Sequence, residues 1–188
     1  MKVEIKVHEK LEQSLSGWKW PVQRHTTDII EATDEKQIAD GMWTIDKNIW
    51  VGVNTADCAP VCMWKDGKVV VVHAGWRGLV DGIIENGLAM FSGEPECFVG
   101  PLYKKFEIQK DACYDQISAR FGTVFFEESG GKVYFCFEDA VRSIVPKNTQ
   151  WDGRNTFEDE TLASWRRDKN YKFANWTMIR IIADDETV

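Results

Sequence analysis

The stretch that decides the fold is residues 64–78, which read WKDGKVVVVHAGWRG. Asp66-Gly67 lies between two apolar runs, and this pair readily adopts the backbone of a tight hairpin turn. The sequence therefore predicts two antiparallel strands, residues 61–64 and 68–72, that meet at this turn. His73 closes the second strand, so we expect its side chain at a strand end, facing a glycine-flanked loop.

Further elements follow from the spacing of apolar residues along the chain. Strands are predicted at residues 3–7, 42–45, 49–53, 133–137 and 176–182. Helices are predicted at residues 79–90, 111–121 and 137–145, and Pro146 ends the last of them. We expect an α+β fold with a mixed, largely antiparallel β-sheet and packed helices, in a single domain that spans residues 1–188.

Composition limits the classes of partner. The chain carries 23 Lys and Arg against 30 Asp and Glu, a formal net charge of −7, which disfavours nucleic acid as a partner. No apolar stretch approaches the roughly 20 residues that cross a bilayer, so we expect neither a membrane span nor a signal peptide. The five cysteines include no CxxC pair, a pattern typical of reduced thiols in the cytoplasm.

Three side chains suit a transition metal. Cys58 lies eight residues before Asp66, and His73 lies six residues after Gly67, so the hairpin places them at roughly opposite positions at one end of the sheet. His25 supplies a candidate third ligand from a separate segment. Imidazole and thiolate donors suit zinc, with copper as the other choice, and three protein ligands leave a fourth position open to water or substrate.

Several motifs resemble those of the YfiH-like family, also called laccase-domain or multicopper polyphenol oxidase-like proteins. The motifs are Gln23-Arg24-His25, residues 55–61 (TADCAPV), residues 73–78 (HAGWRG), Gly100-Pro101 with residues 106–108 (FEI), and residues 164–168 (SWRRD). The resemblance covers residues 21–182. In two respects the sequence departs from the family's pattern: the usual N-terminal extension is missing, and Thr26 stands where the family usually has glycine.

This resemblance implies a zinc-dependent cytosolic enzyme with metal ligands at His25, Cys58 and His73. The implied activity is that of a purine nucleoside phosphorylase, whose partners are a small nucleoside and phosphate. Adenosine deaminase and methylthioadenosine phosphorylase activities are also attributed to the family. Copper oxidase chemistry of the true laccase type is excluded, because three histidines in the whole chain are too few for a blue-copper centre and a trinuclear cluster.

Other residues are candidates for catalysis or substrate binding. Arg77 sits at a glycine-bracketed strand-to-helix junction that favours an anion such as phosphate; capping of nearby carbonyls is the alternative. Arg166 and Arg167, expected on a strand, are weaker phosphate candidates. Asp57 is a candidate general acid or base, or a residue that orients a ligand, unless it binds its own turn.

Two further functions stay open. In one, Cys58 is a nucleophile and His73 its base in a metal-free cysteine hydrolase that acts on an amide. In the other, the chain is a non-enzymatic metal-binding protein. The remaining cysteines are expected to be small buried apolar residues without partners; they are Cys62, Cys97, Cys113 and Cys136.

Overall fold

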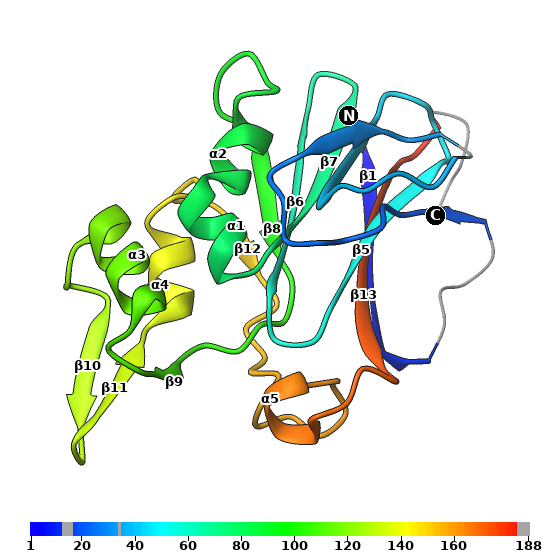
Figure 1. Ribbon diagram of the computed structural model, residues 1–188. Helices are drawn as coiled ribbons and strands as arrows, with labels where there is room; N and C mark the ends of the chain where they lie inside the picture. The colour runs from blue at the N-terminus through cyan, green and yellow to red at the C-terminus, as the bar shows by residue number, and fades with distance from the viewer. Residues whose placement is uncertain (13–16, 34, 184–188) are drawn as a thin grey trace.

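A six-stranded sheet lies at the centre of the molecule, and the predicted hairpin forms its two middle strands (Figure 1). The computed structural model describes residues 1–12, 17–33 and 35–183. Strands β6 (Ala59–Lys65) and β7 (Lys68–Ala74) pair antiparallel. Asp66 and Gly67 at the turn both have positive φ, 47° and 80°, as a two-residue hairpin turn of this kind requires. The hairpin prediction is confirmed.

The remaining strands of this sheet flank the hairpin in the order β12-β8-β6-β7-β4-β3. They are β3 (Ile29–Glu31), β4 (Gly41–Thr44), β8 (Glu96–Val99) and β12 (Gln150–Trp151). The pairings β3 with β4 and β8 with β12 are parallel, and the others are antiparallel.

The valines of β7 serve two hydrophobic cores. Val70 and Val72 face the core beneath the helices, and Val69 and Val71 face the core against a second sheet. A strand that is buried on both faces reads as a continuous apolar run instead of an alternating pattern. This explains the four consecutive valines.

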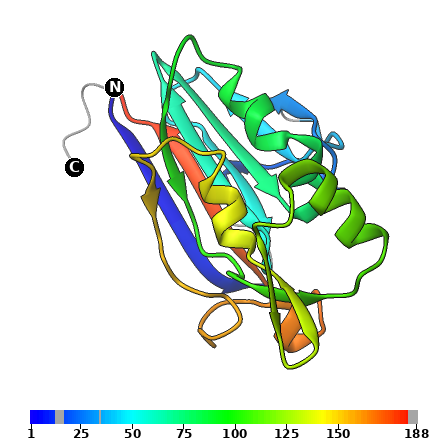
Figure 2. The same ribbon diagram turned by 90° about the vertical axis from the view of Figure 1, so that its left-hand side faces the viewer.

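The second sheet has four strands in the order β1-β13-β5-β2. They are β1 (Val3–Leu11), β2 (Trp18–Lys19), β5 (Trp50–Thr55) and β13 (Ala174–Ile181). In Figure 2 the long strands β1 and β13, blue and red, run side by side, and helices lie on the opposite side of the central sheet. The molecule is therefore layered as helices, six-stranded sheet and four-stranded sheet.

The helices differ from the prediction in two places. They are α1 (Trp76–Asp81), α2 (Ile83–Leu88), α3 (Ala112–Phe121), α4 (Phe137–Arg142) and α5 (Trp165–Asp168). The single helix predicted at residues 79–90 was wrong, because Gly82 adopts φ 91° and separates α1 from α2, and a left-handed residue does not continue a helix. The expectation that Arg166 and Arg167 lie on a strand was also wrong, since both belong to α5.

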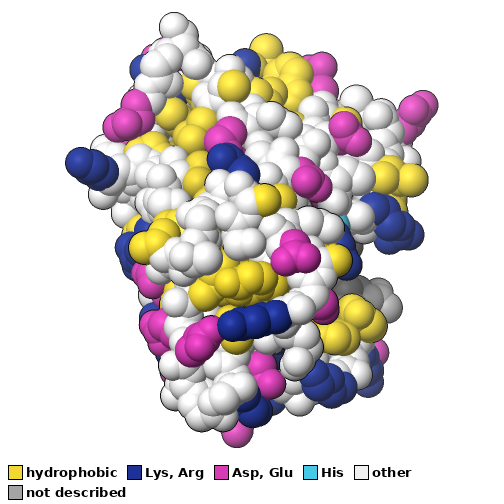
Figure 3. Space-filling view, turned by 60° about the vertical axis from the view of Figure 1, so that its left-hand side comes forward, with side chains coloured by type: hydrophobic (Ala, Val, Ile, Leu, Met, Phe, Trp, Pro, Cys, Tyr) yellow, Lys and Arg dark blue, Asp and Glu magenta, His cyan; other side chains and the backbone are white. Residues whose placement is uncertain are grey.

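A third sheet of three antiparallel strands projects from the helical side (Figure 1). It contains β9 (Phe106–Ile108), β10 (Phe126–Ser129) and β11 (Lys132–Phe135). Lysine-glutamate pairs lie along it: Lys105–Glu127, Lys110–Glu128 and Lys132–Glu107. Acidic and basic side chains are interspersed over the face shown in Figure 3, with apolar patches between them. The α+β class and the mixed, largely antiparallel pairing are confirmed, and none of the described helices is long and apolar enough to cross a membrane.

Candidate metal centre

The side chains of His25, Cys58 and His73 converge at one end of the central hairpin. Their ligand atoms all lie within 4.8 Å of one another. Sγ of Cys58 lies 4.0 Å from Nε2 of His25, and the two imidazole rings meet edge to face with their centroids 4.8 Å apart. The structure thus brings together the three residues that the sequence singled out.

The hairpin register places two of the three. Pro60 pairs with His73 and Ala59 with Ala74, so Cys58, one residue before β6, reaches the end of the sheet where His73 lies. The predicted opposition of Cys58 and His73 is confirmed. The imidazole of His73 is buried and Cys58 is half-buried.

His25 comes from an irregular segment and has a left-handed backbone, φ 59°, which a residue with a side chain rarely adopts. Its two neighbours are held by one carboxylate. Oδ2 of Asp40 accepts hydrogen bonds from the backbone N–H of Arg24 (3.0 Å) and of Thr26 (2.6 Å), and from the Thr26 hydroxyl (3.0 Å). These bonds fix the loop on both sides of His25 and offset the cost of its conformation.

Asp40 also orients His73. Nδ1 of His73 donates to Oδ1 of Asp40 at 2.7 Å, and both side chains are buried. This bond fixes the ring and leaves Nε2 for the cluster, as carboxylates commonly do for metal-binding histidines. Burial alone raises the pKa of Asp40, but the bonds from His73, Thr26 and Arg24 outweigh it and hold this pKa well below its usual range.

Sequence reasoning missed Asp40, which precedes Gly41 and reads locally as an ordinary turn residue. The residue lies 33 positions from His73, and no local pattern marks a partner at that separation.

The charges of the cluster are coupled. Burial raises the pKa of Cys58, but His73 and His25 lower it more, to about 6. Burial lowers the pKa of His73, but Cys58 and Asp40 raise it to about 9. Cys58 therefore carries a thiolate at neutral pH, and the thiolate is the form of cysteine that binds metals.

Gly75 provides the space for this cluster. A Cβ at this position would lie 2.7 Å from Cδ2 of His25 and 3.1 Å from Sγ of Cys58. The backbone of Gly75, φ −77° and ψ 172°, is one that any residue adopts, so space requires the glycine and conformation does not. Two imidazoles, one thiolate and a cradle that a methyl group would fill fit a tetrahedral metal ion with one position left open.

Asp57 ties distant segments to the Cys58 loop. Its backbone has φ 102°, and its side chain is buried. Oδ1 accepts from the hydroxyl of Thr156 (2.7 Å), and Oδ2 accepts from the backbone N–H of Arg166 (2.8 Å). Neither bond is made to the turn of Asp57 itself.

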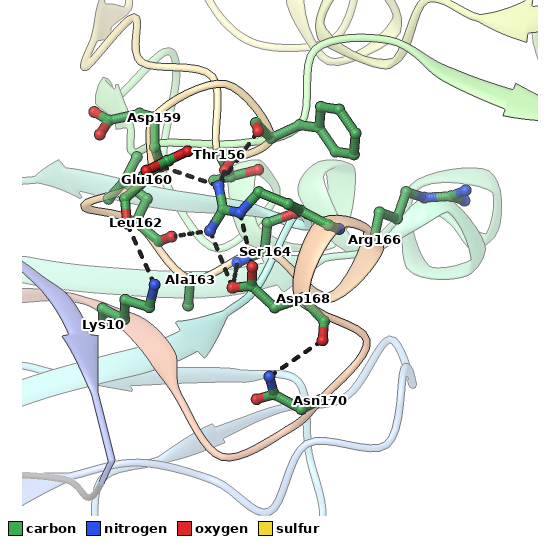
Figure 4. A network of polar contacts seen from close by, with 12 residues as sticks. Lys10, Thr156, Asp159, Glu160, Leu162, Ala163, Ser164, Arg166, Asp168 and Asn170 are labelled. Atoms are coloured by element: carbon green, nitrogen blue, oxygen red, sulfur yellow. Dashed lines mark hydrogen bonds and ion pairs between the residues drawn. The ribbon is translucent and has the colours of Figure 1, made fainter.

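Arg167, a predicted substrate-binding residue, is bound to other parts of the protein. Its guanidinium donates to the carbonyls of Thr156 (2.7 Å) and Leu162 (2.6 Å) and pairs with Asp168 at 2.7 Å. These bonds are drawn in Figure 4, where the side chain of Arg166 points away from the network. Arg167 thus holds the segment before α5 together, and its donors are committed to the protein.

The guanidiniums of Arg77 and Arg166 make no such hydrogen bonds to the described residues. Within the described part of the chain neither guanidinium pairs with a carboxylate; that of Arg77 lies 4.5 Å from the Trp76 ring centre and that of Arg166 lies 4.1 Å from the Phe106 ring centre. Burial and Asp111 raise the pKa of Cys113, whereas both arginines lower it. Both guanidiniums therefore act electrostatically on this half-buried thiol.

Comparison with known proteins agrees with this geometry. The family model described as "Multi-copper polyphenol oxidoreductase laccase" matches residues 4–181. The chain belongs to this family. It is 33% identical over 163 residues to a purine nucleoside phosphorylase of Aquifex aeolicus, an alignment that covers 79% of this chain and 76% of the relative. It is 28% identical over 166 residues to the purine nucleoside phosphorylase YfiH of Escherichia coli, with 80% and 68% covered.

Solved structures share the fold. A protein of Neisseria meningitidis superposes with a TM-score of 0.79 at 23% identity and covers 88% of this chain and 75% of its own. The protein YfiH of Bacillus licheniformis superposes with a TM-score of 0.76 at 20% identity, with 88% and 74% covered. The predicted membership of the YfiH-like family is confirmed.

Proposed function

We propose that this protein is a metal-dependent purine nucleoside phosphorylase, which uses phosphate to cleave a nucleoside into a free base and a sugar phosphate. The observation that carries the proposal is the convergence of His25, Cys58 and His73 within 4.8 Å, in a chain whose relatives bear that name. The substrates we expect are adenosine, inosine, guanosine and methylthioadenosine.

The proposed metal is zinc, with copper as the alternative. His25, Cys58 and His73 would hold it, and Asp40 keeps Nε2 of His73 available. When bound, such an ion polarises the departing base or the ribose. The donor set of two imidazoles and one thiolate supports either metal.

We assign phosphate to Arg77. Arg77 lies two residues after Gly75, whose backbone packs against the side chains of His25 and Cys58. The Arg77 guanidinium is exposed and has no carboxylate partner among the residues that the structure describes. Arg166, whose guanidinium also has no carboxylate partner among the described residues, is the second candidate. A free guanidinium can bind phosphate through two parallel hydrogen bonds.

Deamination of adenosine is the second activity proposed at this site. Asp57 is our candidate for proton transfer, because it is adjacent to Cys58 and buried. Each of its oxygens already accepts one hydrogen bond, and a carboxylate oxygen can accept a second.

The test is metal analysis of the purified full chain together with product detection from inosine and adenosine, with and without phosphate. We expect about one zinc per chain, free base from inosine only when phosphate is present, and ammonia from adenosine without phosphate. Chelation should abolish both reactions and zinc should restore them. Stoichiometric metal without any product would instead support a non-enzymatic metal-binding protein.

One observation favours the metal-free cysteine hydrolase as a second candidate. Asp40, His73 and Cys58 occur in the order of an orienting acid, a base and a nucleophile, an arrangement used in acyl transfer. His25, 4.0 Å from the sulfur, has no task in that chemistry. Amide hydrolysis by metal-free protein that survives His25→Ala would favour the hydrolase.

A further inference from the structure

Asp57, the residue before the proposed ligand Cys58, binds the segments of two aromatic residues. Its carbonyl accepts a hydrogen bond from the backbone N–H of Tyr103 at 2.8 Å, and its carboxylate binds the hydroxyl of Thr156 at 2.7 Å. Phe157 follows Thr156 directly. A single buried residue, adjacent to Cys58, therefore holds the segments of Tyr103 and Phe157 against the cysteine loop.

The backbone then sets the two rings against each other. Leu102 and Asn155 form a parallel β-bridge, and the N–H of Thr156 donates to the carbonyl of Leu102 at 3.1 Å. Tyr103 and Phe157 stack with ring centres 4.9 Å apart and planes 15° from parallel.

Part of this stack faces solvent. Phe157 is 40% exposed although one face of its ring is covered by Tyr103. Behind Tyr103 the row continues to Phe106, 6.0 Å away, over which the guanidinium of Arg166 lies at 4.1 Å. The stack thus forms an aromatic wall that is open to solvent at Phe157. At its other end lies the guanidinium of Arg166, which has no carboxylate partner in the described part of the chain.

A planar, nitrogen-rich heterocycle matches this wall. Stacking on an aromatic side chain tolerates any base, because every base has a π-face. The neighbouring site would then act on the sugar attached to that ring.

We propose that Tyr103 and Phe157 form the wall on which the purine base of the substrate stacks, with the base against the open side of Phe157. Phe157 determines affinity for the nucleoside, and the cleavage step belongs to the metal centre. This inference rests on the proposed function, since it names the binding surface for the same substrate.

The chain offers a matched control. Trp165 and Tyr171 form another stacked pair, with ring centres 5.9 Å apart and planes 30° from parallel, and Tyr171 is 84% exposed. Removal of the Tyr171 ring deletes an exposed aromatic from a stack that is separate from the Tyr103–Phe157 wall.

The experiment measures steady-state kinetics of Phe157→Ala, Phe157→Trp and Tyr171→Ala, each with wild-type metal content and melting temperature. With inosine varied at saturating phosphate, Phe157→Ala should raise KM for inosine about tenfold, a size typical of the loss of one base stack. Its kcat and its KM for phosphate should change less than about twofold. Phe157→Trp should restore KM. An unchanged KM in Phe157→Ala, or an equal rise in Tyr171→Ala, would overturn the proposal.

A binding arm separates this inference from the proposed reaction. Saturation-transfer NMR with inosine and no phosphate measures affinity without turnover. If the wild type binds inosine here but releases no base in the kinetic assay with phosphate, and Phe157→Ala weakens binding about tenfold, the reaction is refuted and the base wall stands. If the wild type binds neither inosine nor adenosine, the base wall is refuted.

Discussion

Oδ1 of Asp40 lies 2.7 Å from Nδ1 of His73, and both side chains are buried. The second oxygen of the same carboxylate holds the backbone on both sides of His25. One residue that is not itself a ligand therefore positions two of the three proposed ligands. The geometry of the centre depends on Asp40 as much as on the ligands.

Asp40→Asn should weaken zinc binding about 10- to 100-fold, the range found for residues that orient a metal ligand. An amide group in place of Oδ1 would favour the wrong tautomer of His73, and the loop of His25 would lose a charged acceptor. Competition with a fluorescent chelator measures the affinity. Asp28→Asn, at a nearby exposed residue, is the control. Equal affinity in the two variants would contradict the role of Asp40.

Cys58→Ala should remove the bound metal and the activity, whereas Cys62→Ala should keep both. Cys62 is fully buried in the core between the two large sheets, so its loss costs packing, about 1–2 kcal/mol of the free energy of unfolding. Metal analysis and urea denaturation separate the two effects. A folded Cys62→Ala protein without metal would count against the assignment.

Alkylation of the metal-free protein should depend on pH in a way that identifies Cys58. Its pKa is lowered from an ordinary value near 9 to about 6, so the folded protein holds the thiolate above pH 6. Iodoacetamide at pH 7 should label Cys58 first, with a rate that falls as the pH drops through 6, and zinc should protect it. Burial raises the pKa of Cys62, which keeps that thiol unreactive. Peptide mass spectrometry identifies the labelled cysteine. Labelling of Cys113 before Cys58 would contradict the prediction.

Both pKa shifts stabilise the metal-free fold, but their contributions depend on pH in opposite directions. The lowered pKa of Cys58 stabilises the metal-free fold above the ordinary value near 9, and this contribution is lost as the pH falls through 6. The raised pKa of His73 stabilises it below the ordinary value of 6.5, and this contribution is lost as the pH rises through about 9. The thiolate and the imidazolium therefore coexist between about pH 6 and 9.

Gly75→Ala should abolish metal binding and leave the fold intact. The new methyl group would lie 2.7 Å from the His25 ring, while the backbone at this position accepts alanine without strain. The control is Gly78→Ala, whose methyl group would have as its nearest atoms Ile83 at 3.3 Å and the backbone oxygens of Thr26 and His73 at 3.6 and 3.7 Å, none of which belongs to a ligand side chain. Circular dichroism and metal content decide the outcome. Normal zinc in Gly75→Ala would show that the three ligands do not need this space.

Arg77→Ala and Arg167→Ala should fail in different ways. Loss of Arg77 should raise KM for phosphate and slow phosphorolysis of inosine by orders of magnitude, and Arg77→Lys should stay impaired because it lacks the bidentate geometry. Loss of Arg167 leaves buried carbonyls without donors and should lower stability by about 2–3 kcal/mol. Kinetics with phosphate varied, on samples of equal metal content, make the comparison. Unchanged phosphate dependence in Arg77→Ala would move the role to Arg166.

The sequence predicted those parts of the fold that depend on neighbours along the chain. The Asp66-Gly67 turn and the valines after it determine the hairpin, and the hairpin register places Cys58 opposite the end of β7. Gly82 shows the limit of periodicity, since apolar spacing continues across a break that only the backbone angle reveals.

Contacts between distant segments could not be predicted from the sequence. Asp40 reaches His73 across 33 positions, and Tyr103 stacks on Phe157 across more than fifty. Each of these residues reads locally as an ordinary turn or core residue. Arg167 shows the converse case: its motif indicated a substrate ligand, and the surrounding carbonyls, which only the folded chain brings together, occupy its donors.

His25 and Cys58 are 33 positions apart in the chain, and His25 belongs to an irregular loop while Cys58 adjoins a strand. A metal held by both would close that length of polypeptide into a ring, as a removable cross-link does. In a disulfide, closure of a ring this long restricts the unfolded chain by about 3–4 kcal/mol. The ion would then stabilise the segment of residues 25–58 in the folded chain. On chelation, this segment should unfold before the central hairpin does.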